Sequence, residues 1–324
     1  MMCVHLAALA QVDSLRVHHQ RVVFWNVENA FWPEDDPRCD DDEFTPDGQR
    51  HWTHSRLRQK LLQLTRVILA AGDGQAPMLV GLAEVEGDSV MRYWTRHTPL
   101  WDQHYDYVVT QGPDRRGIQT ALLYIPFDFR LISAEGHDIS VPSHPTRQLL
   151  HAAGRLVSGD TLDVIVCHLP SRLGGERQSR PRREVAHRVL MQLADSIALV
   201  RAKPNILIMG DMNDAPNDRN AWWGSGYHNL MTPLQRALPL HPSRRGSHKF
   251  HGEWSFLDQF IVHDSLLHRV SLNVSNPRSF SMPFMMISDD TYLGHRPKRS
   301  YYGYQYEGGY SDHLPILLDL DIKF

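Results

Sequence analysis

The sequence has no apolar run that approaches the roughly 18–20 residues of a membrane-spanning helix. It contains only three cysteines, Cys3, Cys39 and Cys167, which are too few and too scattered for a zinc-binding set or a disulfide framework. It also has no excess of basic residues, since 34 Lys and Arg against 37 Asp and Glu give a net charge of −3. Proteins that bind nucleic acid over their whole surface usually show such an excess. Any phosphate binding must therefore be local.

The sequence also has no internal repeat and no linker that would divide it. With 42% hydrophobic and 22% charged residues, the composition is that of a globular protein. We therefore expect residues 21–324 to form one domain, preceded by a segment of residues 1–20. This segment is either a clipped secretory signal, since residues 8–10 are small-x-small, or no signal, since a basic start is missing. The first alternative implies a secreted or periplasmic protein, and the second a cytoplasmic one.

Short apolar runs rich in Val, Ile, Leu and aromatic residues predict buried strands. They span residues 22–25, 78–83, 105–110, 120–125, 162–167, 206–209, 256–262 and 314–320. Apolar residues spaced i, i+4, i+7 and i+11 predict two helices, one from Leu57 to Ile68 and one from Ala186 to Ile197. Pro181 suits the first turn of the second helix. This mixture predicts a layered α/β fold whose sheets are covered on both faces.

Three further segments have a marked composition. The acidic run 34–43 (EDDPRCDDDE) and the aromatic run 301–310 (YYGYQYEGGY) are predicted to be loops. The acidic run lacks the ligand spacing of an EF-hand, which favours a solvated loop over a calcium site. The apolar run 280–287 (FSMPFMMI) is a membrane-insertion element or packs into the core, and we favour the core.

Polar side chains follow or precede most of the predicted strands. They comprise five carboxylates (Glu28, Glu84, Asp211, Asp258 and Asp312), two histidines (His168 and His313) and two asparagines (Asn26 and Asn213). Such groups at strand tips indicate a polar cleft at the edge of a sheet. The excess of oxygen ligands and the absence of Cys favour Mg²⁺, Mn²⁺ or Ca²⁺ over zinc. A metal of this kind polarises a phosphoryl oxygen while Asp and His move protons.

A serine nucleophile is less favoured by the sequence. There is no Gly-x-Ser-x-Gly elbow, and Ser311 is only a sequence neighbour of Asp312 and His313. Asp258 is the most informative carboxylate, because it lies in the apolar run 256–262. A carboxylate buried there without a partner would be destabilising, so we expect it to have one.

Six segments resemble, in order, the motifs of the endonuclease/exonuclease/phosphatase superfamily. They are 23–29 (VFWNVEN), 82–86 (LAEVE), 167–172 (CHLPSR), 209–214 (MGDMND), 254–259 (WSFLDQ) and 310–315 (YSDHLP). The resemblance runs from about residue 21 to 322. It implies a four-layer sandwich in which two packed mixed β-sheets are flanked by helices, with the site at one edge of the sheets. The superfamily includes nucleases, sphingomyelinases and inositol polyphosphate phosphatases, so the resemblance does not identify a substrate.

The resemblance also implies a metal site. By position, Glu84 is similar to the principal Mg²⁺ ligand of the family. Asn26 and Glu28 lie where the family has metal-site or phosphate-site residues, and Asp312 lies at the metal edge. We therefore expect these four residues at a site for Mg²⁺, with Mn²⁺ or Ca²⁺ as alternatives.

The catalytic residues implied by the resemblance are five. Asp211 is similar to the carboxylate that orients the attacking water, and Asn213 to the amide that holds the phosphate. Asp258 is expected to orient His313. His168 matches a second imidazole, which stabilises the pentavalent phosphorus or protonates the leaving oxygen. Abasic-site endonucleases have Tyr at the position of His168, so this chain resembles the branch with pancreatic-type deoxyribonuclease, sphingomyelinases and inositol phosphatases instead.

Two basic segments are candidates for substrate binding. Arg172 and Arg177 open an arginine-rich stretch after His168, and an arginine beside a phosphate site can clamp a phosphodiester with two hydrogen bonds. Lys298 and Arg299 precede a cluster of tyrosines, which we interpret as a second rim of the site.

These observations predict a divalent-metal-dependent phosphoesterase, most consistent with a nuclease-like phosphodiesterase that works by in-line attack of water. Its partner is a phosphoester substrate, nucleic acid among the options. One alternative is a phosphatase or a sphingomyelinase- or phosphoinositide-type phosphoesterase. An alternative of another class is a non-catalytic binding protein on the same fold, which the full set of matched catalytic positions disfavours.

Overall fold

The computed structural model describes residues 16–141, 144–172, 174–216, 223–231 and 246–324. The stretch that resembles the end of a secretory signal and Cys3 lie outside these residues. Strand β1 (Val17–Ala30) already begins inside the segment 1–20 that the sequence set apart. The ordered fold therefore starts a few residues earlier than expected.

Two sheets of six strands form the body of the described chain. In the first sheet the order is β13-β18-β1-β2-β4-β3, and in the second it is β5-β6-β7-β8-β12-β9. Only β1 with β2 and β7 with β8 pair in parallel, so both sheets are mixed. The remaining strands of the first sheet are β2 (Leu79–Val85), β3 (Asp106–Val109), β4 (Gln119–Tyr124), β13 (Leu272–Ser279) and β18 (Ile316–Lys323). The second sheet comprises β5 (Phe129–His137), β6 (Leu149–Leu156), β7 (Thr161–His168), β8 (Ile206–Asp211), β9 (Tyr227–Asn229) and β12 (Asp258–His263).

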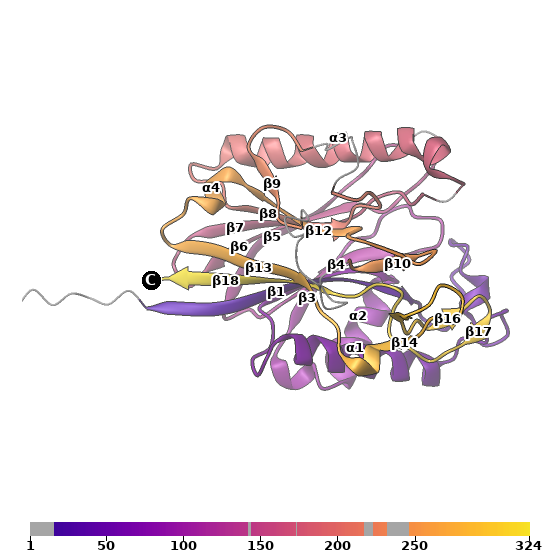
Figure 1. Ribbon diagram of the computed structural model, residues 1–324. Helices are drawn as coiled ribbons and strands as arrows, with labels where there is room; N and C mark the ends of the chain where they lie inside the picture. Colours follow the sequence, from indigo (N-terminus) through magenta and orange to yellow (C-terminus); the bar gives the residue numbers. More distant parts are fainter. Residues whose placement is uncertain (1–15, 142–143, 173, 217–222, 232–245) are drawn as a thin grey trace, which may run out of the picture.

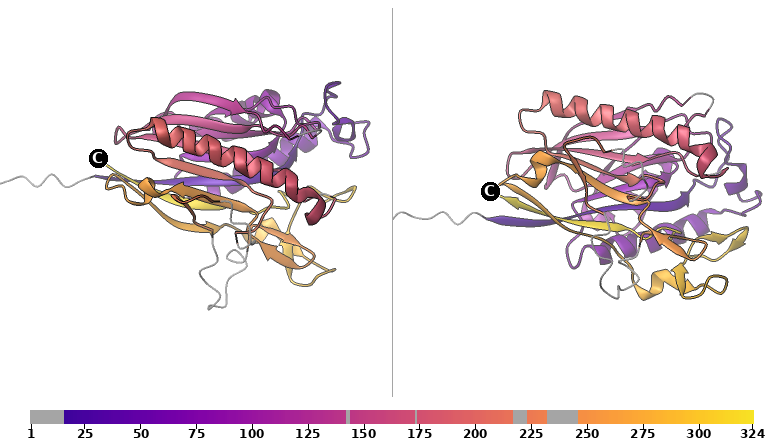
Figure 2. Two further views of the ribbon diagram at one scale, coloured as in Figure 1. Left: turned by 90° about the horizontal axis from the view of Figure 1, so that it is seen from above. Right: turned by 45° about the horizontal axis from the view of Figure 1, so that its top comes forward.

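Helices cover the outer faces of the two sheets. The α-helices are α1 (His54–Ala71), α2 (Gly87–His97), α3 (Glu176–Val200) and α4 (Asp264–Leu267). In Figure 1, α3 lies above the second sheet, and α1 and α2 lie below the first sheet. Figure 2 shows from two further sides that α3 runs along the outer face of its sheet. Within the described residues, no helix combines the length and apolar character needed to cross a membrane.

Three hydrophobic clusters separate these layers. One joins the facing sides of the two sheets through residues such as Phe24, Met209 and Phe260. A second packs α1 and α2 onto the first sheet, and a third packs α3 onto the second sheet through Leu190 and Ile208. Three cores between four layers confirm the expected four-layer sandwich of two mixed sheets flanked by helices.

All eight predicted strands and both predicted helices are present, but several elements were missed. Strand β5 has mostly half-buried or exposed residues, so it lacks the continuous apolar run of a central strand. The expected loop 301–310 instead contains a hairpin of β16 (Tyr301–Tyr302) and β17 (Gln305–Tyr306). Two more hairpins pair β10 (His248–Phe250) with β11 (Glu253–Ser255), and β14 (Met286–Ser288) with β15 (His295–Pro297).

Two local expectations need correction, and a third is confirmed. Helix α3 begins at Glu176, so Pro181 lies in its second turn and not in its first. Strand β12 begins at Asp258, so this carboxylate lies at the tip of the strand and not inside it. The run 280–287 packs into the core as favoured, since Met285 is buried in the cluster between the first sheet and its helices.

The packing of α3 onto its sheet can be tested within one helix. We expect Leu190→Ala to lower the free energy of unfolding by about 2–5 kcal/mol, because it leaves a cavity in a closed interface. Leu199 is the matched control, because it lies on the same helix and is 87% exposed, against 0% for Leu190. Leu199→Ala should change stability by less than about 0.5 kcal/mol in the same urea titration. Equal losses would show that α3 is not packed as described.

Candidate active site

Six strand ends from both sheets meet at one edge of the sandwich. In the second sheet, His168 ends β7, Asp211 ends β8 and Asp258 begins β12, and Asp211 is the register partner of both others. In the first sheet, Asn26 and Glu84 lie in the C-terminal parts of β1 and β2, which reach the same edge. His313 precedes β18, which runs antiparallel to β1. The edge is therefore built from residues that lie up to about 290 positions apart in the chain.

Asp258 and His313 form a hydrogen-bonded pair across the two sheets. The distance between His313 Nδ1 and Asp258 Oδ2 is 2.8 Å, and Asp258 is completely buried. Burial by itself would lower the pKa of His313, but the charge and hydrogen bond of Asp258, with Asp211 and Asp312, raise this pKa well above its ordinary value. The imidazole is therefore held in one orientation and favours the protonated form.

Asp211 lies at the centre of the site. Its Oδ2 is 3.8 Å from His313 Nε2 and 3.7 Å from His168 Nε2, and it accepts a 3.1 Å hydrogen bond from Asn26 Nδ2. Burial raises the pKa of Asp211 to about 6, and the neighbouring Asp258 adds to this. A carboxylate with a pKa in this range can take up a proton near neutral pH, as a general base must.

Glu84 is only partly enclosed, with a side chain that is 14% exposed. Its Oε2 accepts the Asn29 N–H at 2.9 Å, and its Oε1 lies 3.5 Å from Asn26 Nδ2. Among the described residues, no Lys or Arg side chain forms an ion pair with it. Asn26 directs its amide nitrogen to both Glu84 and Asp211, and its oxygen accepts the Glu28 N–H. Its amide group thus orients two carboxylates.

The backbone at this edge is strained. Glu28, Asn29, Glu84 and Asn213 all have φ between 52° and 66°, the left-handed region that L-residues other than Asn and Asp rarely adopt. Two of these residues are glutamates, for which no local side-chain turn relieves the cost. Strain of this kind persists only where the surrounding structure imposes it, and it concentrates at functional sites.

His168 is buried beside two arginines. Arg147 is itself buried and donates hydrogen bonds to Asp114 Oδ2 at 3.1 Å and to the Leu169 carbonyl at 3.0 Å. Burial, together with the positive charges of Arg147 and Arg116, lowers the pKa of His168 well below its ordinary value. His168 is therefore neutral near pH 7 while His313 is charged. The two imidazoles of the site thus differ in protonation state.

Glu28 and Asp312, both expected at the metal site, are bridged by Arg299. Arg299 Nε donates to Glu28 Oε1 at 2.8 Å, and Arg299 Nη2 donates to Asp312 Oδ2 at 2.9 Å. Burial would raise the pKa of Asp312, but Arg299 and His313 lower it to about 2. Burial raises the pKa of Glu28 to about 7, against the opposing charges of Arg299 and the buried Lys60. Arg299, which the sequence places on a second rim of the site, thus directs its guanidinium toward two of the expected metal-site residues.

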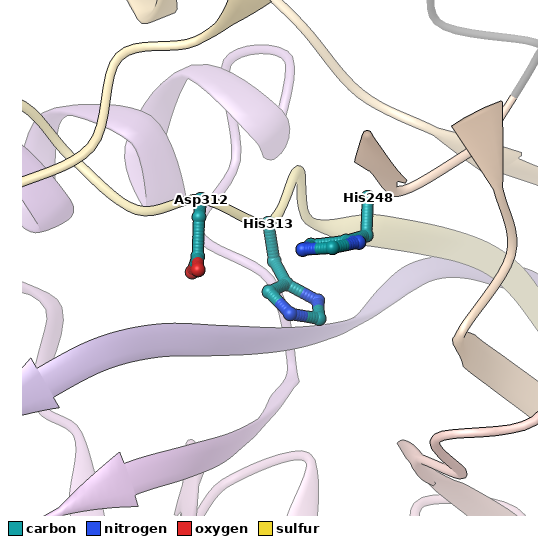
Figure 3. Close-up of side chains that lie close together, drawn as sticks. All are labelled: His248, Asp312 and His313. Atoms are coloured by element: carbon teal, nitrogen blue, oxygen red, sulfur yellow. The ribbon is translucent and has the colours of Figure 1, made fainter. Parts of the chain in front are cut away.

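His248 is a site residue that the sequence analysis missed. It forms an isolated β-bridge with His313 at the start of β10, and the two rings lie with their centroids 4.6 Å apart and their planes tilted by 39°. Figure 3 shows His248 beside His313, with Asp312 on the other side of His313. Burial and the charge of His313 lower the pKa of His248 to about 4. No motif marks this histidine, because only the fold brings β10 to the site.

Two groups of side chains in the described chain bring possible metal-ligand atoms within 4.8 Å of one another. They are His248, Asp312 and His313, and Asp211, Asp258 and His313. Both groups depend on His313, whose Nδ1 already bonds Asp258. Neither includes Glu84.

Asn213, Arg172 and Arg177 differ in how close they come to this centre. Asn213 donates its backbone N–H to Asp211 Oδ1 and its side-chain amide to the Leu169 carbonyl, both at 2.9 Å. Arg172 bonds the Asn213 carbonyl at 2.8 Å and Asp214 at 3.1 Å, so it supports the Asn213 turn. Arg177 is exposed near the start of α3, and the described chain shows no ion pair from it.

A cavity of about 800 Å³ adjoins the end of β2. Its wall includes Glu86, two residues after Glu84, together with Trp32, Asp114 and Gln119. Six carboxylates and two arginines line it, and Arg38 and Arg115 are each paired with an aspartate. Burial raises the pKa of Glu86 to about 8, so this group is mainly protonated at neutral pH. The cavity wall offers hydroxyl and amide groups for hydrogen bonds. Its carboxylates disfavour an anionic ligand.

Comparison with known proteins gives one family and several similar folds. The model of the Endonuclease/Exonuclease/phosphatase family matches residues 21–322. Three similar solved structures are a humanized D. rerio TDP2, the human Nocturnin catalytic domain with bound sulfate, and a mannosyl-6-phosphatase of Bacteroides thetaiotaomicron. They are 14%, 18% and 15% identical to this chain, with TM-scores of 0.57, 0.56 and 0.57.

The alignments with these structures extend over nearly whole chains. They cover 93%, 94% and 93% of this chain and 98%, 96% and 99% of the three structures, in the same order. At such identities the likeness concerns the fold. A search of curated protein sequences gives no match.

Proposed function

The chain belongs to the Endonuclease/Exonuclease/phosphatase family, and from this membership and the geometry of the strand edge we propose that it is a divalent-metal-dependent phosphoesterase. The observation that carries the proposal is the Asp258–His313–Asp211 arrangement, with Glu84 and Asn26 beside it. Neither core packing nor a surface turn requires this set of buried charged groups. A binding protein on the same fold would have no need of a charged His313 next to a neutral His168.

The donor chemistry of the site fits a hard divalent cation at Glu84. Glu84 is partly exposed, forms no ion pair with a Lys or Arg among the described residues, and offers two carboxylate oxygens as ligands. Mg²⁺ is commonly bound by one or two carboxylates, with water and substrate phosphate completing its shell. When bound, such an ion polarises the phosphoryl oxygen and stabilises the developing negative charge. Mg²⁺ is the ion we propose, with Mn²⁺ as its closest substitute.

The other residues position the substrate and move protons. We assign to Asp211 the orientation of the attacking water, since its pKa is raised to about 6 and Asn26 fixes its oxygen. His313, held charged by Asp258, stabilises the negative charge on the phosphoryl oxygens. His168, which is neutral, accepts or relays a proton at the opposite side of Asp211. Asn213 supports this edge through its turn.

The direct test is hydrolysis of a panel of phosphoesters by the purified full chain. The panel contains DNA, RNA, sphingomyelin, phosphoinositides, sugar phosphates and small diesters, each with Mg²⁺, with Mn²⁺ or with EDTA. We expect metal-dependent release of product from at least one class, and release that is at least about a hundredfold slower after His313→Ala. Activity that persists in EDTA, or a folded protein inactive on every class, would contradict the proposal.

We place nuclease-type phosphodiesters first among the substrates and phosphate monoesters of polar alcohols second. The adjoining cavity favours the second candidate, because its carboxylates repel a polyanion and its amides and protonated Glu86 can bond hydroxyl groups. The mannosyl-6-phosphatase among the similar folds acts on a substrate of this kind. The exposed arginines at the start of α3, Arg177 among them, favour the first candidate.

Salt dependence separates the two candidates. If a long nucleic acid is the substrate, KM should rise steeply between 50 and 200 mM salt (about tenfold or more), because phosphate contacts release counterions. Arg177→Glu should then flatten this dependence. Arg58→Glu is the control, because Arg58 is an exposed arginine on α1, and it should leave the salt dependence unchanged. Arg201 is unsuitable as a control, because it pairs with the buried Asp163. A KM for DNA that is constant across this range would favour the monoester.

A further inference from the structure

We propose that Arg299 takes the place of a cation between Glu28 and Asp312, so that this protein binds one divalent ion per chain, at Glu84. The inference rests on the proposed function, because it concerns the metal of the same site. It changes the expected ligand set, in which Glu28, Asp312 and Glu84 all belonged to the metal site.

The contacts of Arg299 resemble those of a bound cation. Its Nε and Nη2 bond one oxygen each of Glu28 and Asp312, at 2.8 and 2.9 Å. The second oxygen of Glu28 accepts the Ser300 N–H at 2.7 Å. Glu28 is only 3% exposed, so both oxygens of its carboxylate are bonded within the protein and closed to solvent. Hydrogen bonds with an ionised donor are a stronger class, and a guanidinium remains charged at every accessible pH.

A second basic side chain, Lys60, lies close to Arg299 and the two carboxylates. Lys60 is 2% exposed and donates hydrogen bonds to Ser300 Oγ at 2.5 Å and to the Tyr310 carbonyl at 3.0 Å. It thereby supports the residue whose N–H bonds Glu28. Arg299 and Lys60 therefore both act on Glu28 and Asp312. A divalent ion entering between Glu28 and Asp312 would have to displace Arg299 and would be repelled by Lys60.

Glu84 differs from these two carboxylates in its partners. Its only ion-pair contact in the described chain is a 3.9 Å approach to His168, which is longer than the bonds that Arg299 makes. Its neighbour Asn26 contributes an amide nitrogen and no charge. Glu84 is thus the metal-site carboxylate that, within the described chain, forms no ion pair with a Lys or Arg side chain.

The test is the stoichiometry of Mn²⁺ binding to the full chain, measured by calorimetry and checked by electron paramagnetic resonance. Wild type should bind one ion, and Glu84→Gln should weaken it by at least about tenfold. Arg299→Met frees Glu28 and Asp312 and should bind two ions. Arg299→Lys keeps the charge and should bind one. Arg296→Met is the matched control, because Arg296 forms a similar pair with Glu307 outside the site, and it should also bind one.

A wild type that binds two ions, or an Arg299→Met variant that folds and still binds one, would overturn the inference. If Arg299→Met does not fold, the triple variant Glu28→Gln, Arg299→Met, Asp312→Asn removes all three charges together. It should bind one ion like wild type, and loss of binding would show that Glu28 or Asp312 is a ligand. Hydrolysis is measured on the same preparations. Two ions in an active wild type contradict only this inference, whereas one ion with no hydrolysis contradicts only the proposed function.

Discussion

Asp258→Asn should lower kcat by about a hundredfold or more, while the affinity for the divalent ion changes little. The reason is that Asp258 bonds His313 Nδ1 at 2.8 Å and has no expected contact with the metal. Without its charge, His313 loses both its fixed orientation and most of the stabilisation of its protonated form. Steady-state kinetics and Mn²⁺ binding measure the two quantities separately.

The same substitution should alter the pH profile in one direction. In wild type the pKa of His313 is raised well above its ordinary value by Asp258, despite burial. Activity that needs the protonated imidazole is therefore retained until high pH. In Asp258→Asn this pKa falls, so the alkaline limb of the profile should move to lower pH. An alkaline limb that stays in place would show that Asp258 does not act through His313.

A double-mutant cycle tests whether the two residues act as one unit. His313→Ala should lower kcat by about 10²–10⁴-fold, the range typical of a lost acid–base group. The double variant should be little worse than His313→Ala alone. Fully additive losses would indicate that Asp258 has only a structural role.

A matched control for this cycle lies in the same sheet. Asp163 is another completely buried aspartate that bonds a histidine, His151, at 2.9 Å, away from the site. Asp163→Asn should lower stability, because Arg201 then loses its partner, and should leave kcat and the pH profile unchanged. This control distinguishes loss of a buried Asp–His pair in general from loss of the catalytic one.

The second large effect is expected for Glu84→Gln. This substitution keeps the shape of the side chain and removes the charge that we assign to metal binding. Metal-assisted charge stabilisation is worth several kcal/mol, so kcat at a fixed low Mg²⁺ concentration should fall by about 10²–10³-fold. Metal affinity should fall with it, and circular dichroism should be unchanged. Turnover close to wild type at low Mg²⁺ would contradict the assignment.

Glu86→Gln is the control for metal affinity, because it makes the same chemical change two residues further along. Burial raises the pKa of Glu86 to about 8, so this side chain carries little charge at pH 7. Its replacement should therefore leave Mn²⁺ affinity within about threefold of wild type, against at least about tenfold for Glu84→Gln. Similar losses in both variants would indicate a general electrostatic effect and no specific ligand.

Local sequence determined most of the framework of this protein. Continuous apolar runs such as 206–209 predict strands buried on both faces, because a strand with one face in solvent alternates apolar and polar residues. The helical spacing of Leu57 to Ile68 likewise predicts an amphipathic helix with one apolar face, and the structure has helix α1 there. Polar residues directly after the runs predict an edge site, because the carboxyl ends of parallel strands such as β7 and β8 meet at one edge. The weakly patterned β5 and the short hairpins carried too little periodicity to be predicted.

Tertiary structure decided which of the edge residues interact and in what charge state. Asp258 and His313 are 55 residues apart and come from different sheets, so their pairing depends on how the sheets pack. The same holds for His248 on His313, and for Arg299, which lies 271 residues from Glu28. The pKa of His313 and that of His168 are shifted in opposite directions, although both are buried histidines at strand ends. Residue type and spacing determine what a side chain can do, but the shift depends on the charges that the fold places within a few ångströms of it.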